Sequence, residues 1–92
     1  MIRSIRHKGL RRLYENGDPC GVIAEHTAKL QDILARLDAA AASADIDLPG
    51  FRLHALKGGF KGFWAVTVRA NWRVIFKLSE GDVLDVDYID YH

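Results

Sequence analysis

Hydrophobic positions in the first half of the chain recur at helical spacing and predict two helices. In the longer helix, expected from about residue 22 to 42, the i, i+3, i+4, i+7 stripe consists of Leu30, Ile33, Leu34 and Leu37. The alanine run that follows continues the good helix formers. A shorter helix is expected within 7–17, where Asn16-Gly17 is a suitable stop.

From residue 51 onward the hydrophobic period shortens toward two, which predicts strands. Aromatic and β-branched residues, which favour strands, are frequent in FWAVTVRA and NWRVIFKL. The glycine-rich stretch KGGFKG and the tetrapeptide SEGD supply turns between the strands. The expected strands are 2–5, 51–56, 63–70, 71–78 and 83–92.

The order of these elements predicts an α+β fold for a single domain, 1–92. Two N-terminal helices should pack on one face of a small, mainly antiparallel twisted sheet, because the apolar helical stripe needs a sheet face to cover it. The natural partner is one row of side chains: Trp72, Val74, Phe76 and Leu78. Arg73 and Lys77 then belong to the opposite face of the sheet.

Composition and cysteine content exclude several classes of protein. Hydrophobic residues make up 49% of the chain, but no apolar run approaches the ~18 residues that a membrane helix needs. We expect no signal peptide, because MIRSIRHKGLRRLYENG contains no unbroken apolar stretch. The single cysteine, Cys20, excludes an internal disulfide and a cysteine-rich zinc site. A cytoplasmic protein without membrane contact is therefore the expectation.

The net charge of +1 hides a strong segregation of charge along the chain. One basic group without acids occupies the first twelve positions: Arg3, Arg6, Lys8, Arg11 and Arg12. A second occupies 48–79: Arg52, Lys57, Lys61, Arg69, Arg73 and Lys77. Acids gather at the end: Glu80, Asp82, Asp85, Asp87 and Asp90. This pattern fits either a solvated surface on which the acidic last strand pairs with basic neighbours or a basic surface for phosphates, and charge alone does not decide between them.

Candidate reactive groups fall near the ends of the expected strands and at the chain end. They are His54, Lys57, Arg73, Asp90, Tyr91 and His92. No serine or cysteine is placed to act as a nucleophile, so acyl transfer by a triad is not expected. RNA brings its own nucleophile, the 2′-hydroxyl, and its cleavage needs only proton transfer and neutralisation of charge on the phosphate. Imidazoles, carboxylates and cationic side chains supply both.

Each of these residues also has an ordinary structural explanation. A lone strand histidine such as His54 is more often a surface or core residue than a catalytic one, and Trp64 and Trp72 suit sheet packing. His54, Asp90 and His92 could also form a two-histidine, one-carboxylate metal site. Cations at the neighbouring lysine and arginine would repel a metal ion, so we expect no metal and no cofactor. Along the last strand, alternate residues share a face, which separates Tyr91 from Asp90 and His92 unless the strand bends.

Four segments together resemble the HigB branch of the RelE/ParE superfamily of bacterial toxins. They are IRSIRHKGLRRLYENG, LHALKG, FWAVTVRANWRVIFKL and DYIDYH. The resemblance covers essentially the whole chain, and its specificity comes from the order and spacing of all four segments. It implies the RelE-like microbial ribonuclease fold and a toxin from a type II toxin–antitoxin system.

The resemblance implies a metal-independent mRNA endonuclease that cuts codons in the ribosomal A site and leaves a 2′,3′-cyclic phosphate. Its implied partners are the 70S ribosome, mRNA and a HigA-type helix-turn-helix antitoxin, with operator DNA bound only through the antitoxin complex. The implied catalytic positions are His54, Lys57, Arg73, Asp90, Tyr91 and His92. Within this set, His54 and His92 are expected to transfer protons, and which is base and which is acid stays open. Lys57 and Arg73 are expected to hold the phosphate.

Basic residues outside the catalytic set are expected to contact RNA or the ribosome. These are Lys8, Arg11, Arg12, Lys61 and Arg69. The turn after LHALKG reads GFKG, where relatives can carry more charge, so Phe60 could offer a face for base stacking. Two other functions stay open: a non-catalytic ParE-like gyrase inhibitor, and an inactive toxin that acts as co-repressor with its antitoxin.

Overall fold

Four antiparallel strands in the order β1-β2-β3-β4 form the sheet of the computed structural model, which describes residues 1–91. The strands are β1 (His54–Ala55), β2 (Trp64–Arg69), β3 (Trp72–Ser79) and β4 (Asp82–Asp90). The expected strand at 2–5 is reduced to two isolated parallel bridges, in which Ile2 lies opposite Val83 and Ile5 opposite Val86. The N-terminal segment therefore covers the outer edge of β4.

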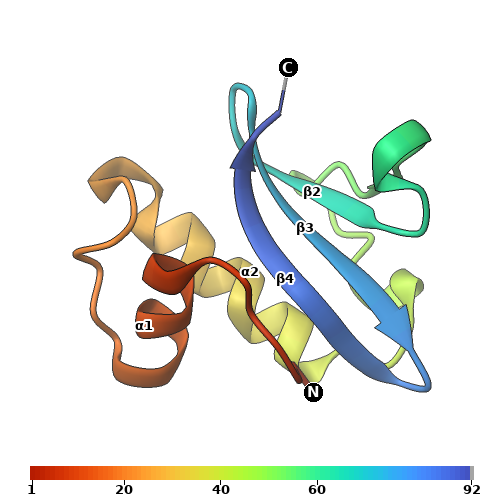
Figure 1. Cartoon of the computed structure of the whole chain (residues 1–92), viewed down its shortest axis with the longest axis horizontal. Helices are drawn as coiled ribbons and strands as arrows, with labels where there is room; N and C mark the ends of the chain where they lie inside the picture. Colours follow the sequence, from red (N-terminus) through yellow and green to blue (C-terminus); the bar gives the residue numbers. More distant parts are fainter. Residues whose placement is uncertain (92) are drawn as a thin grey trace.

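Two helices, α1 (Lys8–Asn16) and α2 (Thr27–Ala39), cover one face of this sheet, as predicted (Figure 1). The α1 helix begins after His7, whose Nδ1 accepts a hydrogen bond of 3.1 Å from the backbone N–H of Leu10. It ends at Gly17, whose φ of 69° lies in the left-handed region that favours glycine. The two N-terminal helices of the predicted α+β fold are confirmed.

The core between helices and sheet contains the predicted partners. The leucines and isoleucine of the α2 stripe are buried, and so are Val74 and Phe76 of the expected β3 row. Trp72 and Leu78, at the two ends of that row, are half-buried and pack against the same core. The burial of an apolar helical stripe on an apolar strand face is thus the main packing interaction of the fold. Among the described residues, no helix has the length and apolar character needed to span a membrane.

The predicted helix over 22–42 is too long at both ends. A separate 3₁₀ turn, Ala24–His26, precedes α2, and the helix ends at Ala39 although alanines follow. The carboxylate of Asp45 accepts hydrogen bonds from the backbone N–H groups of Ala41 and Ala42. These local bonds give the backbone an alternative to helical hydrogen bonds, so the helix does not continue into the alanine run despite its high helix propensity. A second 3₁₀ turn, Ser43–Asp45, results.

The predicted strand over 51–56 is also wrong in extent and in its alternation. Only His54 and Ala55 are in β1, and both are exposed. Arg52 has a positive φ of 52°, which interrupts an extended backbone before β1 begins. After β1, Leu56 is buried, and its N–H donates to the carbonyl of Phe63 at 2.9 Å.

The sheet face opposite the helices carries a second, smaller apolar cluster that the hydrophobic pattern did not predict. It consists of Leu56, Phe63, Ala65 and Ile75, with Ile89 and Tyr91 packed against it. A 3₁₀ turn, Gly58–Phe60, lies within the glycine-rich segment 57–62, on the side of the sheet away from α1 and α2 (Figure 1). We call this side of the sheet, together with segment 57–62, the open face.

Candidate active site

Strand register brings His54, Arg73 and Tyr91 to the open face. His54 lies opposite Ala65, which belongs to the second apolar cluster. Arg73 lies opposite Ile89 of β4, whose side chain packs on the same cluster. Neighbouring strands are spaced about 4.8 Å apart, so the backbones of β1 and β3 are separated by about 10 Å. Residues distant in sequence thus share one face of a sheet that is only four strands wide.

The imidazole of His54 is exposed and oriented by the backbone. Its Nδ1 lies 2.8 Å from the carbonyl oxygen of Arg52. A carbonyl oxygen can only accept, so this hydrogen bond assigns the proton of the neutral ring to Nδ1. The lone pair is then on Nε2, where it can accept a proton. The ring therefore has the tautomer that a general base requires.

Lys57 begins the turn that follows β1, and its side chain is exposed. The turn is closed by backbone hydrogen bonds, including Lys61 N–H to the carbonyl of Gly58 at 3.1 Å. Gly58 and Gly62 have φ values of 65° and 95°, which side chains with a Cβ rarely adopt. The glycines of this segment therefore shape a defined turn, and the flexible Lys57 side chain projects from a fixed backbone.

Arg73 is half-buried, and its guanidinium is held by the backbone. Its Nη1 donates to the carbonyl oxygens of Ala70 and Trp72, the latter at 3.1 Å. Its Nε is buried, and within residues 1–91 no group accepts its hydrogen. A guanidinium presents several N–H donors in a rigid fork that matches phosphate geometry. The two carbonyls fix the direction of that fork.

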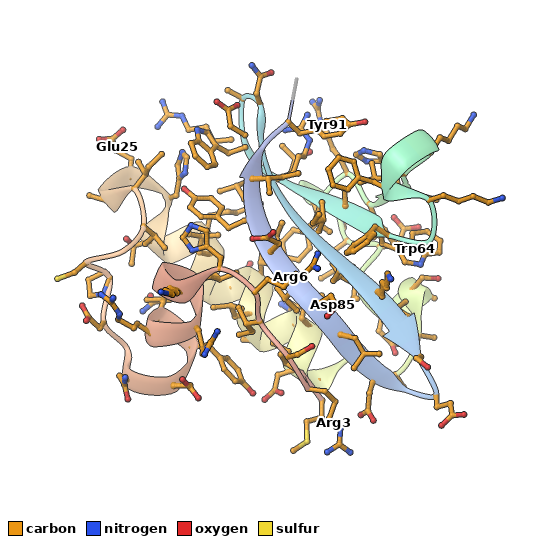
Figure 2. All side chains as sticks on the ribbon, in the orientation of Figure 1. Arg3, Arg6, Glu25, Trp64, Asp85 and Tyr91 are labelled. Atoms are coloured by element: carbon orange, nitrogen blue, oxygen red, sulfur yellow. The ribbon has the colours of Figure 1, made fainter. Side chains whose placement is uncertain are left out.

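The end of β4 is tied down as far as the structure describes it. The backbone N–H of Tyr91 donates to the carbonyl of Asn71 at 2.8 Å, which joins the tail to the β2–β3 hairpin. The tyrosine ring packs on the open face, where it meets Phe60 in a T-shaped arrangement with ring centroids 6.0 Å apart. Figure 2 shows Tyr91 beside segment 57–62.

Asp90 does not share the open face with Tyr91. It lies opposite Trp72 in the β3–β4 register, on the strand face turned toward the helices, and its side chain is exposed. His92, the other group proposed for the chain end, lies outside the described residues. The structure thus brings His54, Lys57, Arg73 and Tyr91 to one side of the sheet, with Asp90 at the end of the last strand.

The basic residues expected to contact RNA or ribosome fall on two separate surfaces. Lys61 is exposed in the turn of the open face, and Arg69 is exposed where β2 ends beside the β2–β3 hairpin. Lys8, Arg11 and Arg12 are exposed on α1, on the other side of the sheet. Within residues 1–91, no carboxylate forms an ion pair with these three α1 side chains. The α1 surface is therefore a separate basic patch.

Two hollows of the molecule are lined by residues other than His54, Lys57, Arg73, Asp90 and Tyr91, although Arg11 of the basic α1 patch borders the larger of the two. A hollow of about 440 Å³ lies between the N-terminal segment and α1, where Arg11 and Tyr14 are among its lining residues. Among the described histidine, cysteine, aspartate and glutamate side chains, no three gather in a way that could hold a metal ion.

Sequence reasoning missed the aromatic cluster that borders the open face. Phe60 and Phe63 meet in a T-shaped contact with centroids 6.2 Å apart, and Phe60 also meets Tyr91. Lys77 Nζ lies 4.8 Å from the centroid of the Phe63 ring, within cation–π range. Phe60 and Phe63 flank Lys61-Gly62, a pairing visible in the sequence, but only the register of β4 brings Tyr91 to them.

Comparison with known proteins gives the same family along the whole chain. A family described as "RelE-like toxin of type II toxin-antitoxin system HigB" matches residues 3–92. The chain is 41% identical over 92 residues to a protein named "Endoribonuclease HigB" from Proteus vulgaris, and the match covers all of both proteins. It is 31% identical to "Toxin HigB-1" from Vibrio cholerae serotype O1, over all of this chain and 98% of the relative.

A solved structure supports the fold. The crystal structure of a YafQ mutant from E. coli superposes with a TM-score of 0.56 at 20% identity. The match covers 92% of this chain and 88% of that one. At this level of identity the likeness concerns the arrangement of helices and strands alone.

Proposed function

This chain belongs to the HigB-like family of RelE-like toxins of type II toxin–antitoxin systems, and we propose that it is an mRNA endonuclease that acts on the ribosome. The observation that carries the proposal is the full-length match, at 41% identity, to a protein named as an endoribonuclease. Cleavage of the codon in the ribosomal A site would stop translation in the cytoplasm, and a cognate antitoxin would neutralise the protein. We propose that this antitoxin is of the HigA helix-turn-helix type and that the complex binds the operator.

The proposed reaction is attack of the 2′-hydroxyl oxygen on the adjacent phosphorus. A new O–P bond forms, the bond to the 5′-oxygen breaks, and a 2′,3′-cyclic phosphate and a 5′-hydroxyl result. His54 suits the base that removes the 2′-hydroxyl proton, because its Nδ1 donates to the Arg52 carbonyl and its Nε2 is left to accept. His92 would then protonate the leaving 5′-oxygen, and Asp90 would orient an imidazole.

Charge neutralisation in this scheme falls to two cations. Arg73 suits the role of phosphate clamp because two backbone carbonyls direct its guanidinium. Lys57 supplies a second, more mobile cation from the neighbouring turn. Tyr91 would polarise the 2′-hydroxyl or stack on a base. No metal ion takes part in any of these steps.

The direct test is cleavage of mRNA on purified 70S ribosomes programmed with a defined A-site codon. We expect a cut in that codon, ending in a cyclic phosphate, that requires the ribosome and is lost in His54→Ala and in His92→Ala. Arg36→Ala, a change on exposed α2, should cut like the wild type and is the matched control. Cleavage that persists in both histidine variants would contradict the assigned roles.

Metal independence needs a separate design, because ribosomes themselves require Mg²⁺. The purified toxin is treated with chelator, freed of it by gel filtration and then added to untreated ribosomes. We expect unchanged cleavage, whereas loss of activity that a transition metal restores would contradict the metal-free scheme. Mapping of mRNA 5′ ends after brief induction in cells extends the test. A DNA-damage response without mRNA cuts would indicate a gyrase inhibitor, and no growth defect would indicate an inactive co-repressor.

We further propose that the basic patch of α1 contacts the ribosomal RNA backbone, and that Lys61 and Arg69 contact RNA beside the open face. Lys8, Arg11 and Arg12 are exposed and free of ion pairs within residues 1–91, so they suit sequence-independent phosphate contacts. Ribosome binding by Arg11→Glu/Arg12→Glu should weaken and lose part of its salt dependence. Reversal of Arg36 to Glu is the control. Equal binding of all three proteins across salt concentrations would remove the proposal.

A further inference from the structure

Phe60 is exposed over 37% of its surface, yet its ring is engaged on two sides. It makes T-shaped contacts with Phe63 and with Tyr91, at centroid distances of 6.2 and 6.0 Å. We infer that Phe60 is a positioning residue: it holds the ring of Tyr91 against the turn that carries Lys57. The effect on cleavage rests on the proposed function, whereas the contact itself does not.

Backbone hydrogen bonds close the turn that carries Phe60. The Phe60 N–H donates to the carbonyl of Lys57 at 3.4 Å, and the Phe63 N–H donates to the carbonyl of Phe60 at 3.0 Å. The base of the turn is closed by Leu56 and Phe63, which are both buried in the second apolar cluster. Lys57 and Phe60 therefore belong to one hydrogen-bonded turn, which places the Phe60 ring relative to Lys57 at the start of that turn.

Tyr91 needs such a contact because it lies beyond the last strand residue. Terminal residues usually fray unless they are tied down. The hydrogen bond to Asn71 fixes the backbone of Tyr91, but it does not fix the side chain. Tyr91 also packs on the second apolar cluster, but edge-to-face aromatic pairs contribute beyond the area that they bury, so we expect the Phe60 ring to favour one Tyr91 orientation on the open face.

A different role for Phe60 would be to stack on an RNA base. That role would act on substrate binding and codon preference, so it would raise KM and leave the tyrosine unaffected in the free protein. A positioning role acts before RNA is bound and lowers kcat at nearly constant KM, because small misplacements of reacting groups are costly. The two roles therefore predict different results in two measurements, one on the free protein and one on RNA cleavage.

The first measurement uses the protein alone. The chain contains three tyrosines, so ¹⁹F NMR of the protein labelled with 3-fluorotyrosine should give three resonances. The resonance that is missing from Tyr91→Phe is that of Tyr91. In Phe60→Ala, we expect the Tyr91 resonance to move toward its unfolded position while Tyr14 and Tyr88 keep theirs. Lys61→Ala, in the same turn, is the control and should move none of them. A Tyr91 resonance that Phe60→Ala leaves in place would overturn the inference.

The second measurement is cleavage on programmed ribosomes. Phe60→Ala should lower kcat about 10- to 100-fold with KM changed less than twofold, and Phe60→Tyr should restore the rate. In a Tyr91→Ala background, Phe60→Ala should cause no further loss, because its target is gone. A raised KM with normal kcat would assign Phe60 to base stacking instead. If the wild type cuts no RNA, the proposed function fails, and the NMR measurement still decides whether Phe60 holds the ring of Tyr91.

Discussion

Gly9 of α1 and Gly21 of the following loop pack backbone against backbone: a methyl group on Gly9 would overlap the carbonyl group of Gly21. Both partners are main chain, so no flexible side chain can move aside. The contact sets how closely the loop after α1 approaches the helix. Glycine is needed here for its size, because neither residue has a positive φ.

Gly9→Ala should therefore destabilise the protein. Alanine is favoured over glycine in a helix by ~1 kcal/mol, so propensity alone predicts a gain. Overpacking against a fixed backbone costs about 1–3 kcal/mol and should outweigh that gain. Gly59→Ala is the control, because a methyl group there meets no atom within 4 Å and its φ is not positive. Urea unfolding should show a lower midpoint for Gly9→Ala only, and an unchanged midpoint would show that the backbones can separate.

Elements with a strong period were predictable from the sequence, and elements set by local hydrogen bonds were not. The α2 stripe and the β3 row both bury apolar positions at a regular period, and they pack on each other as expected. The end of α2 depends on the Asp45 carboxylate, whose bonds to Ala41 and Ala42 compete with helix formation. The break before β1 depends on the positive φ of Arg52, which no hydrophobic pattern encodes.

The chemistry of the candidate site was visible in the residue types, but its geometry was not. Histidine, lysine, arginine and tyrosine are residue types that support the proposed reaction, and the open face carries one of each: His54, Lys57, Arg73 and Tyr91. That Tyr91 meets Phe60 depends on a bulge in β4, where Asp85 has a φ of 52° and the register with β3 shifts. A one-residue slip changes which face each later side chain occupies, so the contact could not be read from spacing.

Asp38 joins the N-terminal segment to both helices, and this link should be sensitive to acid. Its carboxylate accepts hydrogen bonds from the Ile2 N–H at 3.0 Å and from the Tyr14 hydroxyl at 2.9 Å. These bonds, the Ile2 N–H first, lower the pKa of Asp38. The folded-state pKa is depressed, so the stabilisation is present above the unfolded value of about 3.9 and is lost as pH falls through the folded pKa.

Asp38→Asn should lower the free energy of unfolding by about 1 kcal/mol at pH 7, as expected for an exposed charge-assisted pair of bonds. The difference from the wild type should shrink below pH 4. Asp47→Asn, at an exposed site with no hydrogen bond within residues 1–91, is the control. Urea unfolding at several pH values measures both. A difference that stays constant down to pH 2.5 would show that the carboxylate's charge is not responsible.

The buried pair of His26 and Tyr88 should be worth more than an exposed one. Tyr88 Oη lies 2.5 Å from His26 Nδ1, and Tyr88 and His26 are 4% and 5% exposed. Burial raises the pKa of Tyr88, which keeps its hydroxyl protonated. Tyr88→Phe removes the partner of a buried ring nitrogen and should cost about 1–3 kcal/mol. Tyr14→Phe, which removes a more exposed hydrogen bond, is the control and should cost less; the reverse order would contradict the argument.

Arg73→Lys tests whether the fork of donors, and not merely positive charge, serves the proposed cleavage. Lysine keeps the charge, but its three N–H groups share one nitrogen and form no planar fork, so bonds to the carbonyls of Ala70 and Trp72 would leave a single N–H for a phosphate. We expect kcat on programmed ribosomes to fall about 10²-fold, in the range seen for loss of one preorganised donor, with KM changed little. Arg36→Lys, on the exposed surface of α2, should keep the wild-type rate. The urea midpoints of both variants must stay near that of the wild type for the rates to be comparable. Full activity of Arg73→Lys would mean that a point charge is sufficient and that the backbone-directed guanidinium has another purpose.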